Sequence, residues 1–382
     1  MKQKAAIFIT PAVFLILIFG MTVLNFSMPD KSFSESENRF LQQKPQFSWS
    51  ALFDGTFTAD VEKYITDQFP WRDGFIGVKT ETEYVTGKRD TSGVYFGSDG
   101  YLIEKHDPAS VDQKKLEKNQ QRLESFISRV AGELGEDHVR VMIAPTAGEI
   151  LKEKLPPYAQ EFSQAEMFAR MKEKIPAGCW VDLLAVMQQH SGENLYYKTD
   201  HHWTTDGAYL AYRAWCASVG VPGMTADEFD REAVTDRFFG TIYSKARLSS
   251  TKPDTIYAYF PKQEYRYHLT YDLGAKESDS LYDESYLEKK DKYSYFLGGN
   301  NGVVTIQGPN QNGKTLLLVK DSYAHSMAPF LANEFETIQM VDLRYYNGSL
   351  KEFQQQQGIT DVLVLYNAVT FSEDLGVLKM DK

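Results

Sequence analysis

The stretch that decides the fold reads TLLLVKDSYAHSMAPFLANEFETIQMVDL and runs from Thr315 to Leu343. It opens with an apolar run that predicts a buried strand over 315–319, and a helical pattern over 323–333 follows. A second apolar run predicts another strand over 338–343. Short apolar strands separated by helices are typical of a parallel α/β sheet.

The same alternation extends in both directions along the chain. We expect helices over 110–134, 164–174, 204–219 and 349–357, strands over 139–144, 180–183 and 362–366, and a hairpin over 94–102. The segment 222–313 differs, because it carries ten of the chain's 23 tyrosines and alternates with period two. This pattern predicts an inserted antiparallel β-rich segment. Its tyrosines either form a platform for sugar rings or stabilise the sheet through cross-strand pairs.

Ser322 lies where the strand over 315–319 turns into the following helix. A serine on such a turn has an exposed side chain and an N–H at the positive end of a helix dipole, as nucleophilic acyl chemistry requires. In parallel sheets ligands bind beyond the carboxyl ends of the strands, where Ser322 falls. Its neighbour Asp321 points differently on the turn, and we expect it to cap the helix.

A second polar run, TDHHWTTDGA over 199–208, supplies a base and its orienter. Asp200 and His202 are two residues apart next to a helix start, and with Ser322 they form a Ser-His-Asp set in the chain order Asp, His, Ser. His202 alone can be read as a residue that caps or packs at the helix start, but the set of three favours catalysis. Beside the Asp200 carboxylate we expect the pKa of His202 to lie above its usual value of about 6.5.

The alternative chemistry for this run is metal binding. Asp200, His201 and His202 offer oxygen and nitrogen ligands, but consecutive histidines project differently and no further cluster has zinc-like spacing. We therefore expect no metal and no cofactor. His201 then has a structural role or contacts substrate, and Trp203 packs so as to fix the loop.

The N-terminal run Ala5–Phe26 is almost uninterruptedly apolar and follows Lys2 and Lys4. It is long enough at helical rise to cross a hydrocarbon core of about 30 Å. Because no small-x-small cleavage site follows, we favour an uncleaved transmembrane anchor over a removed signal peptide. The positive-inside rule then places the chain after residue 27 outside the cytoplasm.

Composition and length limit the remaining possibilities. The net charge of −11 argues against nucleic acid as a partner, because an acidic surface repels phosphate backbones. Cys179 and Cys216 either pair outside the cytoplasm or remain two separate buried thiols. We divide the chain into a membrane anchor over 1–27, a stalk and lead-in region over 28–110 and a catalytic α/β domain over 111–382.

These residues also resemble a known family. The run Asp200-His201-His202-Trp203 resembles the name-giving motif of the DHHW protein family, and the runs around His202 and Ser322 are similar to the alginate O-acetyltransferase group of SGNH-type hydrolase folds. The resemblance takes in SENR over 36–39, DQFPWR over 67–72 and GVYFG over 93–97.

The resemblance implies a three-layer SGNH-hydrolase-like domain in which Asp200 is the orienter, His202 the base and Ser322 the nucleophile. It also implies an extracytoplasmic enzyme that O-acetylates an exported or cell-surface polysaccharide. A multi-spanning membrane O-acyltransferase would supply the acetyl groups.

The chain departs from the family pattern at the nucleophile, because Lys320 stands at the glycine position of Gly-Asp-Ser. The Gly and Asn blocks that donate to the oxyanion in SGNH hydrolases are also not evident. The remaining candidates for oxyanion or substrate contact are the Ser322 N–H and the side chains of Tyr366, Asn367, Arg344 and His201. These departures favour an alternative, a catalytically inactive membrane-tethered scaffold that binds glycan, whereas the complete Ser-His-Asp set opposes it.

Overall fold

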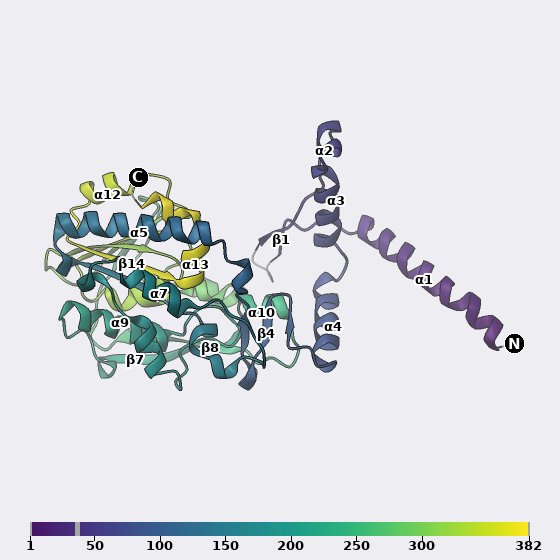
Figure 1. Ribbon diagram of the computed structural model, residues 1–382, viewed down its shortest axis with the longest axis horizontal. Coiled ribbons are helices and arrows are strands. Elements are labelled where there is room, and N and C mark those ends of the chain that lie inside the picture. The colour runs from purple at the N-terminus through teal and green to yellow at the C-terminus, as the bar shows by residue number, and fades with distance from the viewer. Residues whose placement is uncertain (1, 35–38, 381–382) are drawn as a thin grey trace. The chain divides into compact units, whose positions relative to one another are not determined.

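The computed structural model of the chain, drawn in Figure 1, describes residues 2–34 and 39–380. The chain separates into two compact units, one made of residues 1–88 and 244–250 and the other of residues 89–243 and 251–382. The hairpin strands after residue 89 belong to the larger unit. Ser36, Glu37 and Asn38, which contribute to the family resemblance, lie outside the described residues.

The larger unit is built on a seven-stranded sheet of order β10-β9-β11-β13-β12-β14-β6. Its parallel part consists of β13 (Thr337–Val341), β12 (Thr315–Lys320), β14 (Asp361–Asn367) and β6 (Val139–Ala144). Its antiparallel edge consists of β10 (Lys276–Ser278), β9 (His268–Tyr271) and β11 (Val303–Gln307). The predicted mostly parallel sheet is confirmed, and much of the predicted β-rich insert extends this sheet.

Helices cover both faces of the sheet, which gives three layers (Figure 1). One face packs against α5 (Gln113–Leu134), α7 (Gln164–Lys172), α12 (Leu350–Gln356) and α13 (Ala368–Glu373). The other face packs against α8 (Leu183–Gln189), α9 (Thr205–Val219) and α11 (Ala324–Leu331). Because strand side chains alternate, Leu317 and Val319 face the first layer and Leu316 and Leu318 the second. The predicted three-layer α/β fold is confirmed.

Smaller sheets and one correction complete this unit. The hairpin predicted over 94–102 is present as β4 (Val94–Phe96) and β5 (Leu102–Glu104), and a further strand, β3 (Asp90–Thr91), pairs with β4. In addition, β7 (Phe229–Phe238) pairs with β8 (Asp254–Pro261). The strand predicted over 180–183 is wrong. Only Trp180 bridges to β6, because Asp182 accepts the Ala185 N–H and so begins α8.

The two cysteines are free and buried. Of the two alternatives left by the sequence, the structure therefore has separate buried thiols. Burial raises the pKa of the Cys216 thiol to about 12, so this group stays protonated near neutral pH.

The smaller unit contains the predicted N-terminal apolar helix, α1 (Lys2–Ser27). Its segment Ile9–Ser27 has a mean hydropathy of 2.1 and suits either a membrane anchor or a signal sequence. The unit continues through β1 (Phe33–Ser34), β2 (Arg39–Phe40), α2 (Trp49–Phe53), α3 (Thr56–Asp67) and α4 (Arg72–Val85). A short helix, α10 (Thr241–Ala246), lies between β7 and β8 along the chain.

Candidate active site

The fold brings Ser322, His202 and Asp200 together from two distant parts of the chain. Ser322 follows β12 at the carboxyl edge of the sheet, and the other two residues precede α9. His202 Nε2 lies 2.8 Å from Ser322 Oγ, and His202 Nδ1 lies 2.6 Å from Asp200 Oδ1. With Nδ1 protonated, the imidazole donates to Asp200 and accepts from Ser322, which is the arrangement of nucleophile, base and orienter.

The Asp200 carboxylate is held by backbone as well as by His202. Its Oδ1 accepts the His202 N–H at 3.0 Å, and its Oδ2 accepts the N–H and hydroxyl of Thr241 at 2.7 and 3.1 Å. Gly240 permits this approach, because a Cβ there would lie 2.2 Å from the Asp200 Cβ. Sequence reasoning missed Gly240 and Thr241, since a Gly-Thr pair at the start of a short helix carries no distinctive pattern.

Burial sets the protonation of the two ionisable groups. Burial lowers the pKa of His202 to about 4 with help from the neighbouring His201, which outweighs the raising effect of Asp200. The expected upward shift is therefore wrong. Burial would raise the pKa of Asp200, but His201 and His202 hold it well below its usual value. At neutral pH the pair is a neutral imidazole beside a carboxylate, the state that a general base requires.

Tyr293, from the tyrosine-rich insert, stacks on His202. The ring centroids are 3.7 Å apart and the planes differ by 11°. The Tyr293 hydroxyl lies 3.1 Å from both the Ser322 carbonyl oxygen and the Ser326 hydroxyl. Sequence reasoning noticed the density of tyrosines in this segment but had no means of selecting this one.

Trp203 and Tyr323 form hydrogen bonds between the segment before α9 and the turn after β12. The buried Trp203 indole donates to the Tyr323 carbonyl and the Ser326 hydroxyl, both at 3.0 Å. In return the Tyr323 hydroxyl donates to the His201 carbonyl oxygen. These bonds fix the loop before α9 to the turn after β12, and Trp203 packs as expected.

Two of the candidates for oxyanion contact have side chains that are packed in the core or hydrogen-bonded to other residues. Tyr366 is fully buried in the core layer that includes α5 and α13. The Asn367 amide donates to Asp321 Oδ2 and to the Thr370 hydroxyl at 2.6 Å each, and its Oδ1 caps α13. The Ser322 N–H, by contrast, donates to no acceptor within the described part of the chain. Asp321 also accepts the Tyr323 N–H at 2.9 Å, so it braces the turn at the start of α11.

Lys320, which stands at the family's glycine position, belongs to a buried charge cluster. Its Nζ lies 2.7 Å from His325 Nε2 and 3.0 Å from Asp342 Oδ2. Asp342 also accepts from Arg344 Nε at 2.9 Å and Nη2 at 2.6 Å. Burial, reinforced by Lys320, lowers the pKa of His325 well below its usual value, so His325 is neutral. The buried Lys320 side chain therefore has an ionic partner, Asp342, and a hydrogen-bonding partner, His325.

Arg344 and His201, the two other candidates for ligand contact, have partly exposed side chains. The Arg344 side chain is 27% exposed, and its Nη1 has no hydrogen-bond partner among the residues that the structure describes. The His201 side chain is 33% exposed, and its Nδ1 lies 2.7 Å from the Thr241 hydroxyl. Both side chains therefore keep part of their surface open to solvent.

The same residues include the metal-type cluster considered from the sequence. Ligand atoms of Asp200, His201 and His202 all lie within 4.8 Å of one another. However, both ring nitrogens of His202 and Nδ1 of His201 are already hydrogen-bonded, so a metal ion would have to displace those bonds. The geometry favours proton transfer.

Comparisons with known proteins agree with this fold. Residues 127–341 match the family described as DHHW protein. The crystal structure of a DHHW family protein from Eubacterium siraeum is 27% identical with a TM-score of 0.64, covering 76% of this chain and 96% of that one. Bacillus cereus PatB1, in a structure with a sulfonyl adduct, is 20% identical with a TM-score of 0.60, covering 75% and 99%. No curated protein sequence matches the chain.

Proposed function

The chain belongs to the DHHW protein family, and we propose that it is an SGNH-type O-acetyltransferase or acetylesterase with Ser322 as its nucleophile. The observation that carries the proposal is the continuous hydrogen-bonded line from Asp200 through His202 to Ser322. The low pKa of His202 adds support, because the imidazole is neutral and ready to accept a proton at neutral pH.

The proposed reaction has two halves. His202 Nε2 takes the Ser322 proton while Oγ attacks the carbonyl carbon of an acetyl ester, and Asp200 stabilises the imidazolium. The Ser322 N–H donates to the oxyanion. Collapse expels the donor's oxygen, which His202 protonates, and leaves an acetyl ester on Ser322. A sugar hydroxyl in a transferase, or water in an esterase, then gives its proton to His202 and attacks this ester. Collapse of the second tetrahedral intermediate expels Ser322 Oγ, which takes that proton back from His202, and releases the acetylated sugar or acetate.

We place this chemistry outside the cytoplasm, with α1 as a retained membrane anchor. The apolar stretch Ile9–Ser27 supports the anchor. The proposed acceptor is an exported or cell-surface polysaccharide, and the proposed donor is acetyl delivered across the membrane by a multi-spanning O-acyltransferase. Arg344 and His201 are the proposed substrate contacts, because both side chains are partly exposed.

A tethered glycan-binding scaffold is the second candidate. The observation that favours it is the engagement of Tyr366 and Asn367 away from the nucleophile, which leaves the Ser322 N–H as the main oxyanion donor. A scaffold, however, has no need of a buried neutral imidazole beside a serine hydroxyl.

Covalent labelling separates the two candidates. PatB1 has been seen with a sulfonyl adduct, and we expect a sulfonyl fluoride to add one adduct to this chain at Ser322, read by intact mass and peptide mapping. Ser322→Ala should lose both the adduct and the turnover of an activated acetyl ester. The control is Ser326→Ala, which removes a buried hydroxyl four residues along and should still be labelled. Unchanged labelling of Ser322→Ala contradicts the assignment, and a wild type that neither reacts nor turns over ester supports the scaffold.

A further inference from the structure

Helix α4 in the smaller unit carries an exposed apolar stripe. Trp71 at its start and Phe75, Val78 and Val85 within it are 62, 52, 66 and 81% exposed. Their spacing of four, three and seven residues places them on one helix face. A contiguous exposed apolar face of this kind marks a site of contact with a protein or a membrane.

Exposed apolar side chains are concentrated in the residues that directly follow α1. Among the described residues between 28 and 88, twelve large apolar side chains are exposed: Met28, Phe33, Phe40, Phe47, Trp49, Phe53, Ile65, Trp71, Phe75, Val78, Tyr84 and Val85. The described residues from 89 onward have four: Tyr158, Leu273, Tyr345 and Leu375. Scattered apolar residues are normal on a water-exposed surface, but such a concentration beside an apolar span is not.

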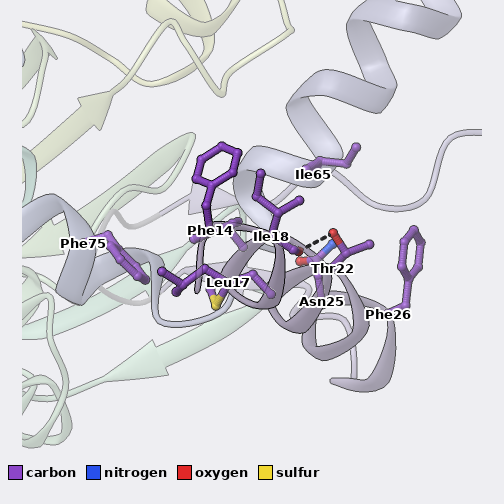
Figure 2. Close-up of a pocket in the computed structure, with 10 residues that line it drawn as sticks. Phe14, Leu17, Ile18, Thr22, Asn25, Phe26, Ile65 and Phe75 are labelled. Carbon is purple, nitrogen blue, oxygen red and sulfur yellow. Dashed lines mark hydrogen bonds between the residues drawn. The ribbon is translucent and has the colours of Figure 1, made fainter. Parts of the chain in front are cut away.

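The stripe is continuous with the surface of the anchor helix. An apolar cavity of about 480 Å³ lies between α1 and the α3–α4 region. Figure 2 shows residues that line it. Leu17, Ile18 and other side chains of α1 line it together with Ile65, Phe69 and Phe75. Phe75 belongs to both the cavity and the stripe. If α1 crosses the membrane, the lining of this cavity therefore meets acyl chains.

We propose that α4 lies on the outer leaflet of the membrane, with its stripe in contact with bilayer lipid and a lipid acyl chain in the cavity beside α1. The inference rests on α1 being a retained anchor, as in the proposed function. Tryptophan and other aromatic side chains are enriched where a protein meets the membrane interface. Residues 28–88 hold seven Lys or Arg against ten Asp or Glu, so the contact is apolar and does not require anionic lipid.

Tryptophan fluorescence tests this placement in the full chain. The protein, carrying Trp49→Phe, is incorporated into phosphatidylcholine nanodiscs with or without bromine near the headgroup end of the acyl chains. Of the remaining tryptophans, Trp203 and Trp215 are buried and Trp180 is partly buried, whereas Trp71 is exposed. We expect brominated lipid to reduce the emission, and Trp71→Phe to remove that loss. The control Trp180→Phe should retain it, and Val78→Ser with Val85→Ser should weaken it.

Each outcome decides the inference. If the protein co-purifies with the discs but its tryptophan emission is the same in brominated and unbrominated lipid, the lipid contact of α4 is refuted. The assignment of α1 as a membrane anchor is then unaffected. Quenching that survives Trp71→Phe also overturns the assignment to α4. Protection of Trp71 from aqueous iodide without quenching by bromine points to a protein partner, including a second copy, and overturns it as well. Chains absent from the disc fraction refute the anchor and this inference together, without bearing on Ser322.

Discussion

The phenol ring of Tyr293 lies flat on the imidazole of His202, with ring centroids 3.7 Å apart. Its hydroxyl lies 3.1 Å from the carbonyl oxygen of Ser322. One side chain therefore contacts both the proposed base and the turn of the proposed nucleophile. It also covers one face of the imidazole and helps to exclude the water that would favour the charged form.

Replacing Tyr293 should test this positioning role. We expect Tyr293→Ala to lower kcat for an activated acetyl ester by roughly 100-fold, because the imidazole gains freedom to rotate. The apparent pKa of His202 in the pH–rate profile should rise at the same time, because water reaches the ring. Tyr293→Phe is the matched control, since it keeps the stack, and should stay within about tenfold of the wild type. An unaltered pH profile in Tyr293→Ala would show that the ring has only a packing role.

Gly240 gives a second test, directed at the orienter. A methyl group at Gly240 would overlap the Asp200 side chain, with its Cβ 2.2 Å from the Asp200 Cβ. We expect Gly240→Ala to move the carboxylate away from His202 Nδ1 and to lower kcat/KM by roughly 100-fold or more. Gly192→Ala is the control, because its Cβ would meet nothing within 4 Å. Equal turnover in the two variants would contradict the need for close backbone approach.

Lys320 is expected to contribute to stability. Its Nζ and the Asp342 carboxylate are both buried, so Lys320→Met leaves Asp342 with Arg344 as its remaining cationic partner. We expect the free energy of unfolding to fall by about 3 kcal/mol, within the usual cost of breaking a buried ion pair. Urea unfolding measures the change, and Lys314→Met, at an exposed position, serves as the control. Equal stability of the two variants would mean that the buried pair contributes nothing.

Much of this site could be predicted from the sequence because local spacing determines it. Asp200 and His202 are two residues apart before a helix, and Ser322 follows a run of apolar residues. The pattern therefore indicates that Ser322 lies at the carboxyl edge of the sheet, where His202 can reach it. The parallel strands of the sheet could also be predicted from the sequence, since their apolar runs are short and separated by helical patterns.

The remaining parts of the site depend on tertiary contacts that spacing does not encode. Tyr293, Gly240 and Thr241 reach the site from the insert, where alternation predicts strands but not which residue faces inward. The side-chain positions at the end of the last strand also depend on tertiary contacts. Successive residues of a strand point to opposite faces of the sheet. The Tyr366 side chain lies in the core, and the Asn367 side chain caps α13.

The pH dependence of turnover follows from the burial of His202. The general base must be neutral in the free enzyme, and burial lowers the pKa of His202 to about 4. We therefore expect kcat/KM to rise with pH through an apparent pKa near that value and to be level around neutrality. A profile on an activated acetyl ester, measured with a substrate that does not ionise, provides the check. A rise centred above about 6.5, the ordinary value for histidine, would mean that His202 is more hydrated than the structure has it.

The last prediction separates proton transfer from metal chemistry at Asp200, His201 and His202. In the proposed mechanism the Asp200 carboxylate holds Nδ1–H of His202, so Nε2 is free to accept the Ser322 proton. Asp200→Asn can favour the wrong tautomer, and we expect it to lower kcat by roughly 1000-fold or more. EDTA should leave the wild-type rate unchanged, because no step uses a metal. The rates of both proteins are measured with and without EDTA, and the metal content of each is measured in parallel. Loss of wild-type activity in EDTA, restored by zinc and accompanied by metal loss in Asp200→Asn, would reject the proton-transfer mechanism and make these side chains metal ligands.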